Sequence, residues 1–229
     1  MEQLYNGFTL EFCPGAFPLS TDSIALSGFV KLPKNAAVLD LGSGCGTLGL
    51  LLCAGDSTCK ITGVELDENA HNCALHNIAA NQLHSRLTSV CADIKDIPSF
   101  LPSGSYHCCV SNPPYFAAGP ASSSVPLARR EDSCDLPALF TSAAWALRYG
   151  GDFFLVHRPE RLAEIFAFAN RVHLEPKRLQ LLHHKRGGPI ALVLVQLRKG
   201  AKPGLLWEEL FLHNEKGEPT QSYRDLYHL

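Results

Sequence analysis

Short apolar runs that favour β-strands alternate along this sequence with longer stretches of helical periodicity. Seven runs are expected to form strands: residues 37–41, 60–65, 87–91, 106–111, 153–157, 178–183 and 190–197. Helices are expected over residues 20–30, 48–54, 68–81, 135–148 and 159–170, with a further short helix near the C-terminus. Strand–helix alternation of this kind produces a parallel sheet that helices cover on both faces.

The last two predicted strands, 178–183 and 190–197, are joined by only six residues. A parallel crossover needs about a dozen residues or more, so these strands are expected to pair antiparallel. The predicted fold class is therefore α/β: a doubly wound, Rossmann-like domain with a seven-stranded mixed sheet and an antiparallel final hairpin. In such a domain, ligands bind at the carboxyl ends of the strands.

The 229 residues are expected to form a single domain, because a chain of this length can bury a core of its own without disulfides. Apolar residues make up 46% of the chain and charged residues 18%, which excludes a disordered tail protein. The apolar runs are too short to span a membrane, and the N-terminus lacks the features of a secretory signal. We therefore expect an intracellular, cytoplasmic protein.

The nine cysteines include no Cys-x-x-Cys motif. An odd number in a chain of this length is more typical of reduced thiols that pack as small apolar residues. His71 and His76 are five residues apart on a predicted helix, so they do not share a face. We expect neither a disulfide framework nor a metal site.

A glycine-rich segment follows the first predicted strand directly, with Asp40, Gly42, Gly44 and Gly46 at alternate positions. Such glycines let the backbone turn tightly and approach a ligand closely. A carboxylate in this loop repels phosphate and suits a cation, such as a sulfonium cofactor that carries an ammonium group. Residues 44–49 also match the G-x-G-x-x-G pattern of nicotinamide enzymes, which leaves an oxidoreductase as an alternative.

Two further acids mark the carboxyl ends of the next two predicted strands: Glu65 ends the first of them, and Asp93 follows the second. Glu65 can accept hydrogen bonds from both ribose hydroxyls of a cofactor, a device that NAD and S-adenosylmethionine sites share. Asp93 can accept from an adenine amino group, although a lone aspartate at this position is more typical of a helix or loop cap.

The tetrapeptide Asn112, Pro113, Pro114, Tyr115 follows the fourth predicted strand. Pro113 keeps Asn112 out of the helical region of the backbone. The side-chain carbonyl of Asn112 and the next peptide carbonyl can then both accept from one planar amino group. The ring of Tyr115 can stack on the base that carries this group. These four residues are the predicted catalytic residues.

The glycine-rich segment beginning at Asp40 and the tetrapeptide beginning at Asn112 together resemble the S-adenosylmethionine-dependent amino-group methyltransferases. Further segments resemble one subfamily, the bacterial valine-tRNA adenine-N6 methyltransferases: residues 17–23, 128–131 and 156–162, with Tyr223 and Tyr227. The resemblance covers nearly the whole chain. It implies methyl transfer from S-adenosylmethionine to the N6 amine of the adenine next to the anticodon of a tRNA.

The resemblance also implies roles for individual residues. It implies that the cofactor is bound by the glycine-rich segment, the two acids, the catalytic loop and the N-terminal segment. The residues concerned are Asp40, Gly42, Gly44, Gly46, Glu65, Asp93, Asn112, Thr21 and Asp22. Asn112 and Pro113 would orient the target amine, and Tyr115 would stack on its base. Residues 1–33 would form a cofactor lid, to which Phe17 and Ser20 also belong.

Basic residues are concentrated in the second half of the chain. Residues 1–115 carry five Lys and Arg against ten Asp and Glu, whereas residues 116–229 carry 15 against 12. Arg129 and Arg130, and Lys185 and Arg186, are expected to contact phosphates of the tRNA substrate, with a solvated charged surface as the alternative. Because the sequence shows no separate RNA-binding domain, we expect the catalytic domain itself, or a homodimer of it, to recognise the tRNA.

Three other enzymes and one binding protein remain as alternatives. Protein glutamine-N5 methyltransferases also use an Asn-Pro-Pro-Tyr loop, but they carry a helical domain for which the residues before Asp40 leave no room. An RNA guanine-N2 methyltransferase is the second alternative. A nicotinamide-dependent oxidoreductase would leave residues 112–115 without a role. An RNA-binding protein that retains a cofactor is the non-enzymatic alternative.

Overall fold

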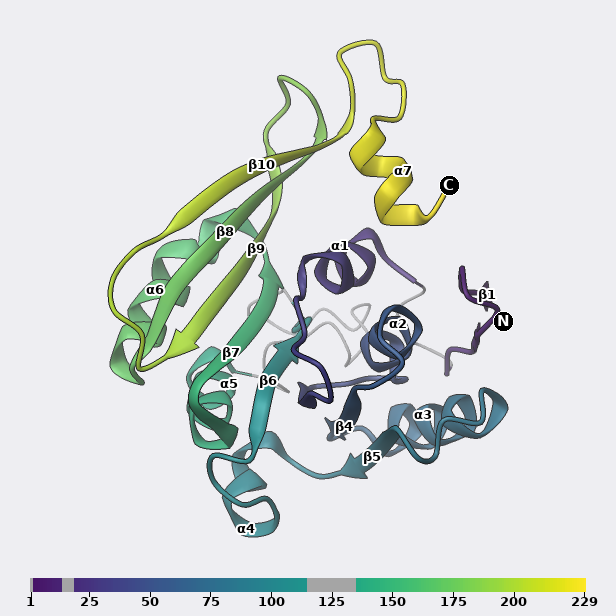
Figure 1. The fold of residues 1–229 in the computed structure, drawn as a ribbon, viewed down its shortest axis with the longest axis vertical. Helices are drawn as coiled ribbons and strands as arrows, with labels where there is room; N and C mark the ends of the chain where they lie inside the picture. Colours follow the sequence, from purple (N-terminus) through teal and green to yellow (C-terminus); the bar gives the residue numbers. More distant parts are fainter. Residues whose placement is uncertain (1, 14–18, 115–134) are drawn as a thin grey trace, which may run out of the picture.

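The computed structural model describes residues 2–13, 19–114 and 135–229. Its main feature is an eight-stranded sheet with the strand order β10-β8-β9-β7-β6-β3-β4-β5 (Figure 1). These strands are β3 (Ala37–Leu41), β4 (Lys60–Glu65), β5 (Leu87–Cys91), β6 (Tyr106–Ser111), β7 (Leu147–His157), β8 (Leu174–Lys185), β9 (Ile190–Lys199) and β10 (Leu206–His213). Near the N-terminus, β1 (Glu2–Gln3) and β2 (Thr9–Leu10) form an antiparallel pair.

The pairing of the strands confirms the predicted mixed α/β sheet. The five strands from β7 to β5 in spatial order are mutually parallel. β9 pairs antiparallel with both β7 and β8, as the short loop between β8 and β9 requires. Because β8 and β7 are both antiparallel to β9, these two strands point the same way. The carboxyl ends of β8, β7, β6, β3, β4 and β5 therefore face the same edge.

The predicted number of seven strands is wrong, because residues 206–213 form an eighth. This strand, β10, pairs in parallel with β8 at the outer edge of the sheet. Its first four residues, Leu206–Glu209, are exposed, and only its second half is covered by other residues. An edge strand that is open to solvent over half its length lacks the continuous apolar run by which the other strands are predicted.

Seven α-helices lie within the described residues: α1 (Thr21–Phe29), α2 (Thr47–Gly55), α3 (Glu68–Ala80), α4 (Ile97–Phe100), α5 (Leu136–Ala146), α6 (Leu162–Arg171) and α7 (Gln221–Tyr227). Short 3₁₀ turns, η1 (Ile94–Asp96) and η4 (Pro159–Arg161), precede α4 and α6. Polar side chains begin four of the helices by accepting from a backbone N–H of the first turn: Ser20, Asp67, Asp135 and Thr220.

The boundary between α5 and β7 differs from the prediction of a helix over residues 135–148. The helix ends at Ala146, and β7 begins at Leu147. β7 pairs Leu147 with Tyr106 and resumes regular pairing at Asp152, so the intervening residues form an irregularity in the strand. Gly150 lies in this irregularity with φ of 77°. Gly150 and Gly151 therefore lie at a bend within strand β7 and do not end helix α5.

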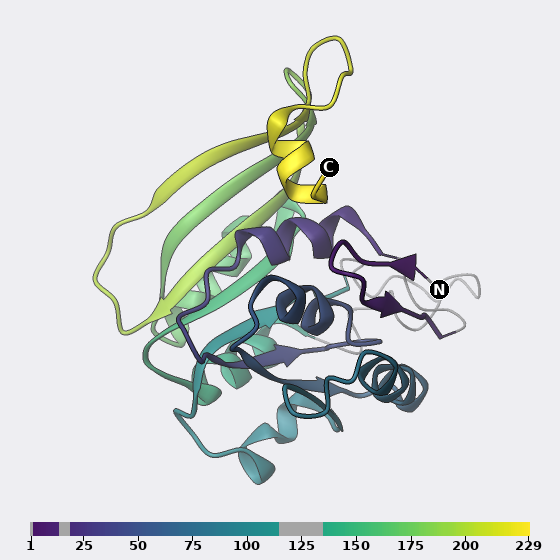
Figure 2. The same cartoon turned by 45° about the vertical axis from the view of Figure 1, so that its right-hand side comes forward.

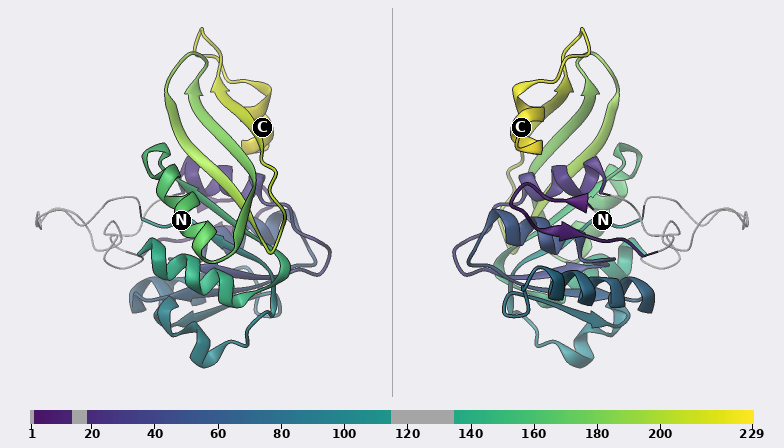
Figure 3. Two further views of the ribbon diagram at one scale, coloured as in Figure 1. Left: turned by 90° about the vertical axis from the view of Figure 1, so that its left-hand side faces the viewer. Right: turned by 90° about the vertical axis from the view of Figure 1, so that its right-hand side faces the viewer.

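Two hydrophobic clusters fill the two faces of the sheet, and the two views in Figure 3 show the helical layer on each side. The strands contribute to both faces by simple alternation. In β7, Phe154 and Val156 pack toward the side of α1 and α2, whereas Phe153 and Leu155 pack toward α5 and α6. Within the described part of the chain, no helix has the length and apolar character needed to cross a membrane.

The two ends of the chain lie together. Figure 2 shows α7 beside α1, although they are about two hundred residues apart in the sequence. The hydroxyl groups of Thr21 in α1 and Tyr227 in α7 are hydrogen-bonded at 2.9 Å. The rings of Tyr223 and Tyr227 stack at 4.5 Å between centroids. Helix α7 therefore braces the beginning of α1.

Replacing Phe153 by alanine tests how much the second cluster contributes to stability. Phe153 is fully buried and packs edge-to-face on Phe140 at 5.5 Å. We expect Phe153→Ala to lower the free energy of unfolding by about 3–5 kcal/mol, because it leaves a cavity that the close-packed sheet and helix cannot fill. Urea unfolding measures this loss. Phe100→Ala, at a position 38% exposed, is the control; equal losses in the two variants would contradict the assigned core.

Candidate active site

The predicted site residues lie on adjacent parallel strands, at or just beyond their carboxyl ends. β6 leads into Asn112, β3 contains Asp40, β4 ends at Glu65 and β5 leads into Asp93. Since β6, β3, β4 and β5 are neighbours in this order, these side chains follow one another along the edge of the sheet. This is the edge at which doubly wound domains bind ligands.

The glycine-rich segment turns sharply between β3 and α2. Gly42, Gly44 and Gly46 all have left-handed backbone conformations, with φ of 73°, 55° and 80°. A Cβ added at Gly42 or Gly44 would meet no atom of the described residues within 4 Å, whereas one at Gly46 would meet the Cβ of Ala74 in α3 at 3.4 Å. The first two glycines therefore face space that a ligand can occupy, and the third allows α3 to pack closely.

Asp40 is a buried carboxyl group beneath this turn. Only 2% of the residue is exposed, and its Oδ2 has no hydrogen-bond partner among the described residues. Burial, together with the nearby charge of Glu65, raises the pKa of Asp40 from 3.8 to about 7, and the backbone N–H of Gly49 offsets part of this rise. An unpaired buried oxygen of this kind fits a ligand that brings a cationic donor to it.

Ser43 adds a second unsatisfied atom to the same turn. Its side chain is buried, and its Oγ also has no partner among the described residues. The backbone N–H groups of Gly42 and Ser43 both donate to the carbonyl oxygen of Val64 in β4, at 2.9 and 3.1 Å. These hydrogen bonds fix the glycine-rich turn against β4, so the backbone of the sheet determines the conformation of the turn.

The two strand-end acids are both held in place by backbone N–H groups. Glu65 accepts from Gly44 at 2.7 Å and from Asp67 at 2.8 Å, and its carboxylate keeps further lone pairs for ribose hydroxyls. Asp93 accepts from Lys95 at 2.9 Å and caps η1. The interpretation of Asp93 as a cap is thus confirmed, and its contact with adenine stays a prediction.

The start of the catalytic loop is held between the sheet and α1. Ser111, the last residue of β6, donates from its hydroxyl to the carbonyl oxygen of Leu41 at 2.7 Å. The side-chain nitrogen of Asn112 donates to the hydroxyl oxygen of Ser23 in α1 at 3.0 Å. Pro113 is buried and Pro114 is half-buried. The other predicted residues Tyr115, Arg129, Arg130 and Phe17 lie outside the described residues.

The N-terminal segment is attached to the cofactor turn through a buried asparagine. Asn77 in α3 is 1% exposed and pairs with the backbone of Glu11, accepting from its N–H and donating to its carbonyl, each at 2.9 Å. The same side-chain nitrogen donates to the carbonyl oxygen of Cys45 at 2.9 Å. The hydroxyl of Thr21, which is predicted to contact the cofactor, is hydrogen-bonded to the hydroxyl of Tyr227. The roles of Thr21 and Asp22 toward the cofactor stay predictions.

Two of these residues were not found by the sequence analysis. Ser23 lies within a motif that indicates the subfamily, but nothing in that motif shows which loop its hydroxyl meets. Asn77 lies in a helix, where a polar residue is ordinarily expected to be exposed. The one available signal is its place on the buried face of α3, in helical register with Ala70 and Ala74.

The basic residues Lys185 and Arg186 lie at the end of β8 and therefore at the same edge of the sheet as Asn112. Both are exposed. The guanidinium of Arg186 lies over the ring of Phe211 at 4.4 Å, and its backbone N–H donates to the carbonyl oxygen of His213 at 2.9 Å. The position of the pair permits contact with a polyanion bound at this edge.

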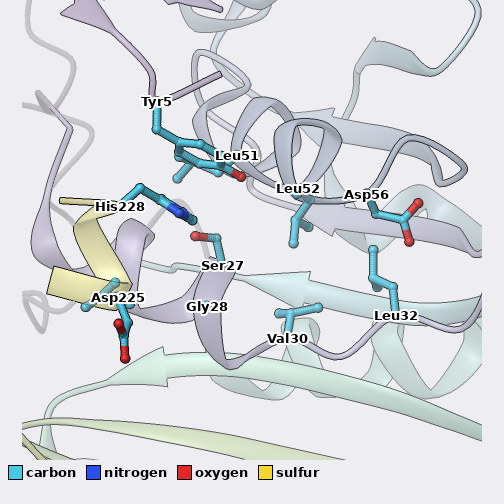
Figure 4. Close-up of a pocket in the computed structure, with 12 residues that line it drawn as sticks. Tyr5, Ser27, Gly28, Val30, Leu32, Leu51, Leu52, Asp56, Asp225 and His228 are labelled. Atoms are coloured by element: carbon cyan, nitrogen blue, oxygen red, sulfur yellow. The ribbon is translucent and has the colours of Figure 1, made fainter. Parts of the chain in front are cut away.

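A cavity of about 320 Å³ lies away from these residues (Figure 4). It is bounded by α1, α2, α7 and the loops that follow α1 and α2, with Tyr5 and His228 at one end and Asp56 at the other. The rings of Tyr5 and His228 stack at 3.5 Å. None of the predicted site residues lines this cavity, so the candidate active site is identified by its chemistry and not by its volume.

The sequence profile of the methyltransferase small domain family matches residues 22–167, which include the glycine-rich turn, both acids and the catalytic loop. The chain belongs to this family. The resemblance that the motifs indicate is thereby confirmed at the level of the family.

Curated relatives in this methyltransferase family are named tRNA1(Val) (adenine(37)-N6)-methyltransferases. The protein of Aeromonas hydrophila is 30% identical over 217 residues, which cover 92% of this chain and 89% of the relative. The protein of Shewanella halifaxensis is 33% identical over 159 residues, which cover 69% of this chain and 64% of the relative. The second match thus spans less than two thirds of the relative's length.

A solved structure gives independent support for the methyltransferase fold. The crystal structure of a protein described as a predicted O-methyltransferase from Agrobacterium tumefaciens superposes with a TM-score of 0.77 at 21% identity. The match covers 91% of this chain and 96% of that protein. At this level of identity the likeness establishes the fold alone.

The raised pKa of Asp40 predicts a specific pH dependence of stability in this methyltransferase. A carboxyl whose pKa is higher in the folded than in the unfolded chain favours folding when protonated, and this contribution is lost as the pH rises through about 7. In Asp40→Asn the side chain stays neutral at every pH. We therefore expect the gain in free energy of unfolding of this variant over wild type to be about 2–3 kcal/mol larger at pH 8 than at pH 5.

Urea unfolding of the ligand-free protein at the two pH values measures this difference. Asp96→Asn is the matched control, because it makes the same substitution at an exposed aspartate. A stability gain of Asp40→Asn that does not change with pH would show that Asp40 is ionised in the fold and would contradict its assigned environment.

Proposed function

We propose that this protein transfers a methyl group from S-adenosylmethionine to the N6 amine of an adenine in tRNA. The names of its curated relatives give the position as adenine 37 of a valine tRNA. The observation that carries the proposal is the juxtaposition of two motifs across neighbouring strands. β6, which leads into Asn112, pairs directly with β3, which contains Asp40. This pairing would bring the proposed cofactor site next to the proposed amine-binding loop.

The described residues fit the cofactor at both of its polar ends. Asp40, with its unpaired Oδ2, would receive the cationic methionine portion, and Gly42 and Gly44 leave the space that it needs. Glu65 would accept from the ribose hydroxyls, and Asp93 would lie beside the adenine. When bound, S-adenosylmethionine supplies an electrophilic methyl group on a sulfonium.

Asn112 would bind and orient the target amine. The N6 amine of adenine is a weak nucleophile because its lone pair is delocalised into the ring. Two carbonyl oxygens that accept its hydrogens, from the side chain of Asn112 and from the backbone that follows it, would aim the lone pair out of the ring plane. Positioning of this kind supplies a large part of the rate acceleration in reactions between two bound partners.

A general base is not needed for this reaction. The methylated amine is cationic and acidic until it loses a proton, which water can accept. Asn112 has no basic group that could do so, and its part is confined to hydrogen bonding. The target base would leave its stack to reach the loop, which costs least in a single-stranded loop, and Tyr115 would stack on it.

The tRNA would lie across the carboxyl edge of the sheet. Lys185 and Arg186, exposed at this edge, would contact its phosphates, and Arg129 and Arg130 are proposed for the same role. We propose residues 1–229 as one catalytic domain, with residues 1–33 covering the cofactor. A homodimer would provide a wider RNA surface, and light scattering of the protein–tRNA complex distinguishes one copy from two.

Methyl transfer into undermodified total tRNA tests the proposed function. With labelled S-adenosylmethionine as donor, we expect label in RNA and N6-methyladenosine in its nucleosides by mass spectrometry. Asn112→Ala should reduce this transfer about 100-fold or more, because the amine is no longer oriented.

The outcomes of this assay separate the alternatives. N2-methylguanosine instead of N6-methyladenosine would favour the RNA guanine-N2 methyltransferase. Label in protein and none in RNA would favour the glutamine-N5 methyltransferase. Stabilisation against heat by NAD and not by S-adenosylhomocysteine would favour an oxidoreductase and would contradict the proposal.

Replacing Lys185 by alanine tests the proposed RNA surface. We expect a higher KM for tRNA, an unchanged KM for S-adenosylmethionine and a slope of log affinity against log salt that is less steep by about 1, because one phosphate contact is lost. Lys60→Ala is the control, because Lys60 is exposed at the beginning of β4, on the opposite edge of the sheet. Equal effects of both substitutions would mean that general charge, and not this edge, attracts the tRNA.

A further inference from the structure

The contact between Asn112 and Ser23 joins the catalytic loop to the N-terminal helix. The side-chain nitrogen of Asn112 donates to the Ser23 hydroxyl oxygen at 3.0 Å, and the two residues are 89 positions apart in the sequence. Ser23 is 8% exposed. A buried hydroxyl that meets the one side chain proposed to hold the target amine is well placed to control that side chain.

Ser23 is held on a fixed element. Its own backbone N–H donates to the capping side chain of Ser20 in the first turn of α1. The neighbouring Thr21 is bonded to Tyr227 of α7, and Leu26 and Phe29 anchor the helix in the first hydrophobic cluster. The hydroxyl of Ser23 is therefore positioned by both ends of the chain and by the core.

The direction of this hydrogen bond determines what Asn112 can offer a substrate. An asparagine amide can be turned by about 180° with little change of shape, so hydrogen bonds decide which end points where. In the structure the nitrogen faces Ser23, so the carbonyl oxygen is directed to the opposite side of the amide group. The reverse orientation would present the amide nitrogen to the target amine, and two donors would then face each other.

We propose that Ser23 is a positioning residue that holds the amide of Asn112 in the orientation required to accept from the target amine. This inference rests on the proposed function and extends it to a residue outside both sequence motifs. Ser23 itself does not touch the substrate in this account. Its loss changes how often Asn112 is correctly turned, so it lowers kcat and leaves the binding of both substrates unchanged.

The test is steady-state methylation of tRNA by Ser23→Ala. We expect kcat to fall about tenfold, with the KM values for tRNA and S-adenosylmethionine within about twofold of wild type. Ser23→Thr keeps the hydroxyl and should restore most of kcat. A Ser23→Ala variant with wild-type kcat, or one in which only the KM values rise, would overturn the inference.

A control of the same kind lies in a helix that is not part of the proposed site. Thr141 in α5 carries a hydroxyl that donates to the carbonyl oxygen of Pro137 at 2.8 Å. Thr141→Val removes a helix hydroxyl of this kind and should leave kcat unchanged. In the background of Asn112→Ala, adding Ser23→Ala should have no further effect on kcat, since the side chain on which Ser23 acts is already gone. Additive losses in this double variant would overturn the inference.

A measurement without the reaction separates this inference from the proposed function. The side-chain NH₂ signals of Asn112 can be assigned in ¹⁵N-labelled protein by their loss in Asn112→Ala. They should shift and exchange faster with solvent in Ser23→Ala, but not in Thr141→Val. If wild-type protein transfers no methyl group to tRNA, the proposed function fails, and these signals then decide the inference: changed signals support Ser23 as the partner of the loop asparagine, and unchanged signals overturn it.

Discussion

The candidate site is built around a carboxyl group that the fold buries with one oxygen lacking a partner among the described residues. Asp40 ends up beneath the turn after the central strand β3, where burial and Glu65 raise its pKa to about 7 and where its Oδ2 lacks a partner among the described residues. An isolated buried charge is costly, so this position is stable only with a proton or with a cation beside it. The proposed binding of a cationic part of the cofactor at this turn rests on that property.

The parallel sheet brings the other predicted site residues at its strand ends to the same edge as Asp40. Because β6, β3, β4 and β5 are parallel neighbours, residues that lie far apart in the sequence reach the same edge in a fixed order. Asn112 is placed next to Asp40 by the pairing of β6 with β3, and Ser111 strengthens this pairing by its bond to Leu41. In the proposed reaction, the spacing of these two strands would therefore set the distance between the methyl donor and the target amine.

The sequence predicts the parts of this arrangement that depend on local pattern. The strands of the central sheet, the three left-handed glycines and the two motifs are all present, because apolar runs, glycine spacing and proline leave local signatures. The eighth strand and the start of β7 were predicted wrongly, because an open edge strand has no apolar run and Gly150 bends a strand where it is expected to end a helix. The contacts of Ser23 and Asn77 depend on packing between distant segments, which no local pattern records.

The contacts of Ser23 and Asn77 both fix the N-terminal segment to the candidate site, and a third contact fixes this segment to the C-terminal helix. Asn77 joins Glu11 to the carbonyl of Cys45 in the cofactor turn, Thr21 meets Tyr227 of α7, and Ser23 meets Asn112. The N-terminal residues are thereby coupled to the cofactor turn and to the catalytic loop at the same time. The proposed methyl transfer relies on orientation and uses no general base, so it would need this rigidity: a small rotation of the Asn112 amide would remove the acceptor on which it depends.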